Sequence, residues 1–225
     1  HYDYLQNRLL PSILIESQAD LLVYGMGETT IVEIADALKS GLNIADIIYV
    51  RGTVWKTTDF NRLPSDAIHL PSFAAVKKSK VSFASSFKIQ YNNTDAIASK
   101  PLVEAYNDVM LVQNQASLPI SRAYFDWVYE LPYERHYHPG YQKPIPAIEE
   151  VKFSLIANRG CMGSCSFCAL SFHQGRIIQS RSKESLVWEA KQIIQDPEFK
   201  GYIHDVGGPT ANFYIKACKK QEEQG

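Results

Sequence analysis

The chain has 225 residues, of which 45% are hydrophobic and 21% are charged, and its formal net charge at pH 7 is -1. This composition is typical of a globular protein and excludes a disordered chain, a collagen and a coiled coil. The lack of excess positive charge argues against binding to nucleic acid or to an anionic membrane. No apolar run reaches the roughly 20 residues that cross a bilayer, so we expect no membrane-spanning segment.

Residues 1–8 lack the charged, apolar and small-residue regions of a signal peptide. The chain also begins with His1 rather than with methionine. We therefore expect a fragment or a processed product.

The first part of the sequence predicts a βαβ unit. Residues 21–24 form a short apolar run, typical of a buried parallel strand, and a glycine pair at 25–27 ends it. Apolar residues then recur at helical spacing as far as Leu38, and Gly41 suits the end of a helix. Residues 45–50 are apolar again and predict a second strand. A strand, a helix and a strand over about 30 residues predict a parallel sheet.

Three further segments precede the cysteines. Residues 73–90 have the pattern of a helix, and residues 108–112 that of a strand. Residues 118–146 hold five prolines interleaved with five tyrosines, which predicts an irregular connector between two domains. Aromatic and basic residues in this segment could also stack nucleic-acid bases, but a connector lying on a domain surface is the favoured interpretation.

The last third predicts two βα units. Apolar and polar residues alternate over 151–157, as in a strand. Ser182 is a suitable N-cap for a helix over 183–195, and residues 201–206 predict the next strand. A second helix is expected from Ala211. The cysteine loop follows the first of these strands, at the carboxyl edge where α/β folds place their sites.

The cysteines indicate a metal or redox cofactor. Cys161, Cys165 and Cys168 fall within eight residues, and Cys218 lies 50 residues further on. Close neighbours in one loop make poor disulfide partners, so we expect a reducing compartment and a cytoplasmic location. Three thiolates suit a [4Fe–4S] cluster with one iron left open, because such clusters normally take four cysteines. Cys218 is the disfavoured candidate for the fourth ligand.

Two other interpretations of the cysteines remain open. His173 could complete a structural zinc site with the three cysteines, although such sites prefer paired Cys-x2-Cys elements. An electron-transfer iron–sulfur protein is the other candidate, although it would need a fourth cysteine nearby. Both describe a module without catalysis at the metal.

The pattern Cys-x3-Cys-x-Phe-Cys after a strand resembles the signature of the radical S-adenosylmethionine (SAM) superfamily. The resemblance implies that Cys161, Cys165 and Cys168 bind a [4Fe–4S] cluster and that SAM chelates the fourth iron. One electron from the reduced cluster would then cleave SAM to methionine and a 5′-deoxyadenosyl radical. That radical would abstract hydrogen from a substrate that the sequence does not name.

The same resemblance implies contacts to the cofactor. Phe167, which precedes the third cysteine, would help to hold the adenine. Gly207 and Gly208 would bind near the methionyl amino group through backbone atoms. The usual acidic residue of that segment is absent, and Pro209 and Thr210 stand in its place. No residue is assigned a catalytic role.

Several basic residues follow the cysteine loop. His173, Arg176 and Arg181 could bind the carboxylate or ribose of SAM, or an anionic substrate. They could equally be solvated residues that hold the next helix. Arg159, which precedes the first cysteine, leaves the same two interpretations open.

Longer segments are similar to the YgiQ family of radical SAM proteins; they are residues 1–4, 22–28, 51–53, 129–133, 159–161, 165–169, 173–176, 180–182 and 205–212. Members of that family are longer than this chain. The resemblance implies an α/β fold in which residues 1–117 are the C-terminal part of a Rossmann-like domain similar to cobalamin-binding domains. Residues 118–146 would be the connector, and residues 147–225 the first βα units of a partial TIM-type radical SAM barrel. An electron donor such as flavodoxin or ferredoxin is also implied.

Overall fold

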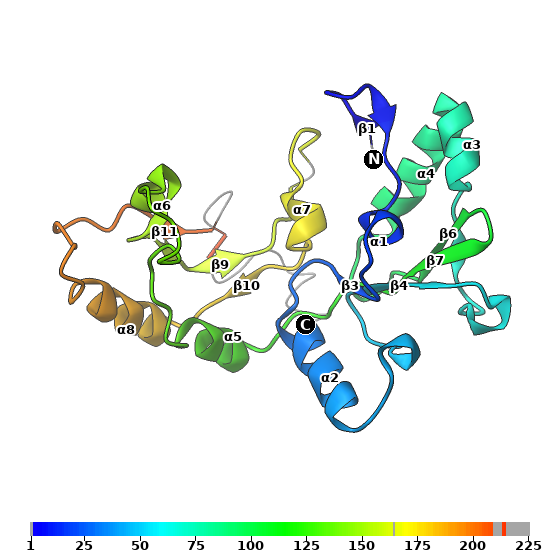
Figure 1. Ribbon diagram of the computed structural model, residues 1–225. Coiled ribbons are helices and arrows are strands. Elements are labelled where there is room, and N and C mark those ends of the chain that lie inside the picture. The colour runs from blue at the N-terminus through cyan, green and yellow to red at the C-terminus, as the bar shows by residue number, and fades with distance from the viewer. Residues whose placement is uncertain (1, 164, 209–212, 215–225) are drawn as a thin grey trace. The chain divides into compact units, whose positions relative to one another are not determined.

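The computed structural model describes residues 2–163, 165–208 and 213–214. The chain divides into two compact units, His1–Leu118 and Pro119–Gly225. Each unit combines helices and strands (Figure 1), which is compatible with the predicted mixed α/β fold. No helix among the described residues is long and apolar enough to span a bilayer.

The first unit is built on a five-stranded mixed sheet. Its strands lie in the order β3 (Leu22–Val23), β4 (Thr53–Thr57), β7 (Val109–Gln113), β6 (Leu102–Tyr106) and β5 (Ile68–His69). The β3–β4, β4–β7 and β7–β6 pairs are antiparallel, and only β5–β6 is parallel. The predicted strand at 108–112 is therefore confirmed as β7. The predicted parallel βαβ unit is wrong, and a Rossmann-like sheet is not confirmed.

The misplaced strand at 45–50 explains this difference. Helix α2 (Glu28–Lys39) forms as predicted and is followed by Gly41 in the left-handed conformation. Ile47 and Val50 are then buried against α2, but the backbone of residues 47–50 does not join the sheet. Gly52, with φ of +73°, next reverses the chain, and its carbonyl accepts a hydrogen bond of 2.9 Å from the Tyr24 N–H. The strand that pairs with β3 comes only after this turn and runs antiparallel.

Two short strands and several helices complete this unit. They are β1 (Tyr2–Asp3), β2 (Arg8–Leu9), α1 (Ile13–Glu16), η1 (Ile44–Asp46), η2 (Phe60–Arg62), α3 (Phe73–Lys78) and α4 (Lys80–Asn92). The helix predicted over 73–90 is thus two helices, because Ser79 has extended backbone angles and caps α4 through its hydroxyl. Ser72 caps α3 in the same way. Both breaks follow the preference of serine for N-cap positions.

The second unit carries two small sheets. Its elements are α5 (Arg122–Tyr129), α6 (Pro146–Val151), β8 (Leu155–Ile156), β9 (Asn158–Arg159), α7 (Leu170–His173), β10 (Gln179–Ser180), α8 (Lys183–Ile193) and β11 (Val206–Gly207). Strand β8 pairs in parallel with β11, and β9 pairs antiparallel with β10. The core joins Phe153, Leu155 and Ile193.

Predictions for this unit hold in part. The helix over 183–195 is confirmed as α8, whose first turn is capped by the Ser182 hydroxyl at 3.0 Å from the Ser185 N–H. The two strands are shorter than predicted, because α6 occupies the start of the first and irregular chain the start of the second. The connector is not wholly irregular, since it contains α5, whose Phe125 is fully buried. The helix expected from Ala211 lies outside the described residues.

The turn at Gly52 gives a test of the fold. A Cβ at Gly52 would lie 2.3 Å from Ser117 Oγ, whereas one at Gly41, which also has positive φ, would meet no atom within 4 Å. Gly52→Ala should therefore lower the free energy of unfolding by about 2–3 kcal/mol, and Gly41→Ala by about 1 kcal/mol, because only the first adds crowding to backbone strain. Urea unfolding of the two variants measures this difference, and equal losses would contradict the role given to the Gly52 turn.

Candidate metal centre

The cysteine loop belongs to the second unit and begins at the end of β9. Gly160 has φ of +90°, and a Cβ there would lie 2.2 Å from the carbonyl oxygen of Ile177, so no other residue fits without moving that backbone. The Gly160 N–H donates to Gln174 Oε1 at 3.1 Å, and the Cys161 N–H donates to the Gly175 carbonyl at 3.0 Å. The start of the loop is thereby tied to its end.

The three thiols differ in exposure. Cys161 is buried, Cys168 is half-buried and Cys165 is exposed, and none of them forms a disulfide. Cys161 Sγ and Cys165 Sγ both lie within 4 Å of the point where a Cβ of Gly163 would stand, at 3.3 and 3.9 Å. The Cys168 N–H donates to the Cys165 carbonyl at 3.1 Å, which closes a tight turn between the second and third cysteines.

These residues are of the right chemical kind to bind a metal cluster, but their side chains are not positioned around a common point. Among the described residues, no three His, Cys, Asp or Glu side chains lie close enough to hold a metal ion. The structure therefore does not assemble the cluster ligands, nor a zinc site that includes His173. The donor set itself fits, because three free thiols on one loop are the ligands that iron–sulfur clusters take. Gly163 also leaves room between the first two sulfur atoms.

Asn158, which sequence analysis missed, adds a second observation at this place. It opens β9, three residues before Cys161, and is fully buried. Within the described part of the chain, neither its Oδ1 nor its Nδ2 has a hydrogen-bond partner. A buried amide without partners is costly, and such exceptions call for an explanation such as a missing ligand or water.

The residues implied to contact SAM differ in their surroundings. The Phe167 side chain is 90% exposed and so packs against little of the protein. The Gly207 carbonyl accepts a hydrogen bond of 2.7 Å from the Ala157 N–H, as part of the β8–β11 pairing, and Gly208 is half-buried. Pro209, Thr210 and Cys218 lie outside the described residues.

Arg181 has a structural position. Its side chain is completely buried, and its guanidinium forms an ion pair with Glu189 of α8. It also donates to the Ile156 carbonyl at 3.2 Å and to Ser185 Oγ at 2.8 Å, and it lies 4.4 Å from the centre of the Tyr129 ring. Of the two interpretations of Arg181, the structure supports the one in which it holds the next helix, but the side chain is buried rather than solvated.

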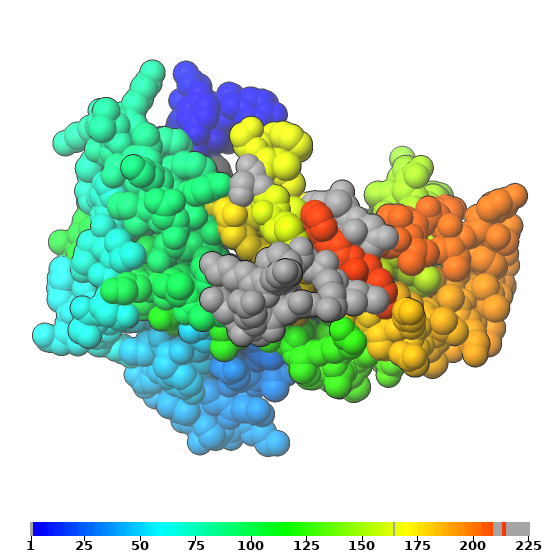
Figure 2. All heavy atoms as spheres, turned by 180° about the vertical axis from the view of Figure 1, so that it is seen from behind, coloured from blue at the N-terminus to red at the C-terminus, as the bar shows by residue number. Residues whose placement is uncertain are grey.

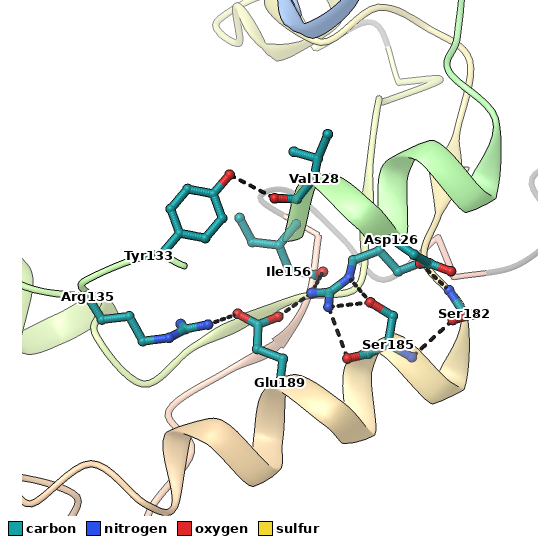
Figure 3. A network of polar contacts seen from close by, with 9 residues as sticks. Asp126, Val128, Tyr133, Arg135, Ile156, Ser182, Ser185 and Glu189 are labelled. Carbon is teal, nitrogen blue, oxygen red and sulfur yellow. Dashed lines mark hydrogen bonds and ion pairs between the residues drawn. The ribbon is translucent and has the colours of Figure 1, made fainter. Parts of the chain in front are cut away.

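The network extends beyond this pair (Figure 3). Glu189 forms a second ion pair with Arg135, and Asp126 of α5 accepts a hydrogen bond of 2.9 Å from the Ser182 N–H. These contacts join α5, the following segment, α8 and the end of β8. Arg159 lies nearby in β9, buried, with its guanidinium 4.5 Å from the centre of the Phe125 ring. The strands that lead into the cysteine loop are therefore fixed by buried charge.

The comparisons with known proteins identify the family. The model of the family described as Radical SAM N-terminal matches residues 1–154. The chain belongs to this family. This match ends before Cys161, so it does not itself cover the cysteine loop. No solved structure matches the chain significantly.

Relatives in this family carry the name UPF0313. The chain is 52% identical over 227 residues to a UPF0313 protein of Clostridium botulinum (strain 657 / Type Ba4), an alignment that covers 100% of this chain and 35% of that protein. It is 51% identical over 223 residues to one of Clostridium perfringens (strain 13 / Type A), covering 98% of the chain and 34% of the relative. The chain thus spans about a third of their length. These matches confirm the predicted membership of a radical SAM family as a partial chain.

The buried network predicts a strong dependence on Glu189. Glu189→Gln removes the carboxylate that Arg181 and Arg135 share and leaves a buried guanidinium unpaired, so it should lower the free energy of unfolding by about 3–5 kcal/mol. Glu184→Gln, at an exposed site on the same helix, should cost only a few tenths of a kcal/mol. Urea unfolding of both variants checks this, and equal stability of the two would refute the network.

Proposed function

We propose that the protein to which this chain belongs is a radical SAM enzyme, in which Cys161, Cys165 and Cys168 hold a [4Fe–4S] cluster. The observation that carries the proposal is the cysteine loop: three free thiols spaced over eight residues, in the loop that follows β8 and β9 of the second unit. When bound, the cluster and SAM supply one-electron cleavage to a 5′-deoxyadenosyl radical. Family membership supports the same conclusion.

The residues of this chain would bind and orient the cofactors. Cys161, tied by its N–H to Gly175, would be the fixed ligand, and the exposed Cys165 would move toward it when the cluster binds. Phe167 has an open ring face on which an adenine could stack. Asn158, at the base of this loop, would form hydrogen bonds with the bound cofactors. These bonds would offset the free-energy cost of burying its amide without a partner.

The second unit is proposed to be the start of a partial TIM-type barrel. Its parallel pair β8–β11, with α8 on the connection between the two strands, is one βα repeat of such a fold. The relatives are about three times as long as this chain. In a full-length protein of that size, the additional residues would form the remaining repeats. Gly207 and Gly208 would then lie at the carboxyl edge of β11, next to the cofactor.

The cellular setting follows from the chemistry. Free thiols and an oxygen-sensitive cluster require a reducing compartment, which points to the cytoplasm. A reductant such as flavodoxin or ferredoxin would deliver the electron. The substrate is a compound that loses a hydrogen atom to the radical, and neither nucleic acid nor a membrane is proposed as a partner.

Iron content distinguishes the ligands. In the full-length protein reconstituted without oxygen, Cys165→Ala should lose most of its iron, because it removes one of three protein ligands. Cys218→Ala should retain about four iron atoms per chain, as the unaltered protein does. Iron analysis and the visible absorption of the cluster measure both variants.

The reverse pattern would overturn the assignment of ligands, and one zinc with no iron in the unaltered protein would support a structural metal module instead. Cluster-loaded protein should also form 5′-deoxyadenosine from SAM when dithionite is added. A stable cluster that never cleaves SAM would favour an electron-transfer protein.

A further inference from the structure

A cavity of about 460 Å³ lies inside the first unit, away from the cysteine loop in sequence. Its floor is one face of the sheet, where Leu102, Glu104 and Tyr106 alternate along β6. Strand side chains alternate between faces, so Val103 of the same strand points to the opposite face. There it packs in a closed core with Trp55 and Val112. The sheet is thus tightly packed on one face and hollow on the other.

The walls of the cavity are mainly apolar. Val76 of α3 and Phe83 and Phe87 of α4 cover it on one side, and Leu9 and Pro11 of the N-terminal segment line another. Figure 1 shows α1, α3 and α4 on the same side of the sheet. The outer surface of α3 and α4 forms the upper part of this unit in Figure 2. Walls of this kind, with few polar groups, are typical of small-molecule sites.

One group of polar contacts in the cavity centres on the carboxyl group of Glu104. Tyr106 donates a hydrogen bond to Glu104 Oε2, and its hydroxyl oxygen accepts one of 3.1 Å from the Ser12 N–H. Tyr106 is held in place by stacking on Phe73, with ring centres 5.0 Å apart. Burial raises the pKa of Glu104, because desolvation outweighs the hydrogen bond from Tyr106. Gln113, on the neighbouring strand, also lines the cavity.

The described lining of the cavity carries an acidic group and no basic one. Among the described residues that line it, Glu104 is acidic and none is Lys, Arg or His. A carboxylate in mainly apolar surroundings is costly unless an opposite charge pairs with it. A ligand that carried a cationic group next to an apolar body would pair with Glu104 and also cover the apolar walls of the cavity.

We infer that this cavity binds a small organic amine with an aromatic or similarly bulky apolar body, whose ammonium group pairs with Glu104. The volume lies within the range of about 300–1,000 Å³ that is typical of ligand pockets. The inference is independent of the cluster and of SAM, since every residue in it belongs to the first unit.

Phenethylamine is the probe that tests this inference, with 3-phenylpropionate as an anion of similar size. Isothermal titration calorimetry on the full-length protein should detect phenethylamine and should show at least tenfold weaker binding of 3-phenylpropionate. Glu104→Gln keeps the shape of the side chain and should weaken phenethylamine binding at least tenfold. Glu33→Gln, at an exposed site on α2, should bind as the unaltered protein does.

A cavity-filling variant separates binding from folding. Ser86 of α4 lines the cavity and is buried, so Ser86→Leu should abolish phenethylamine binding without lowering the melting temperature. The inference is overturned if the unaltered protein does not bind phenethylamine, as when a further segment of the protein fills the cavity. It is equally overturned if Glu104→Gln binds phenethylamine unchanged, or if the anion binds as tightly as the amine.

Discussion

The ion pair between Arg181 and Glu189 is the contact on which the second unit depends. It lies in a fully buried position and joins the end of β8, the first turns of α8 and the ring of Tyr129 at the end of α5. Removing one partner of a buried pair leaves an uncompensated charge, so these elements are constrained to one arrangement. Strand β8 leads directly through β9 into the cysteine loop. The buried ion pair thereby fixes the position at which the cysteine loop starts.

The chain segments around the candidate site could be predicted in part from sequence, because their signals are local, while the role of the three cysteines as cluster ligands stays a prediction. The spacing of Cys161, Cys165 and Cys168 and the Ser182 cap depend on neighbours along the chain, and α8 forms where its pattern predicts. The role of Arg181 depends on contacts 25 residues away in sequence, at Ile156, and could not be predicted in that way. One signal was available: Glu189 falls between Leu186 and Ile193 on the apolar face of α8, where a carboxylate requires a buried partner. The contacts of Phe167, Gly207 and Gly208 with a cofactor stay predictions.

The fold of the first unit shows the limit of apolar patterns. Residues 47–50 are apolar, and Ile47 and Val50 are buried against α2, yet this segment does not join the sheet and Tyr49 is exposed. An apolar run reports burial, while the pairing direction is decided by the turn at Gly52 and by the register that follows. Helix α2 was predictable, because its amphipathic spacing acts within the segment, whereas the single helix predicted over 73–90 is divided at Ser79. The cavity between the sheet and helices α3 and α4 depends on contacts between segments distant in sequence, so no local pattern could predict it.

The central claim is that three protein thiolates leave one iron of the cluster open for SAM. The most direct measurement is electron–nuclear double resonance on the reduced, cluster-loaded full-length protein with SAM labelled with ¹⁵N at its amino group. The account predicts a ¹⁵N coupling to the cluster that disappears when unlabelled SAM is used. A cluster with no ¹⁵N coupling, and with a fourth protein ligand on that iron, would contradict it.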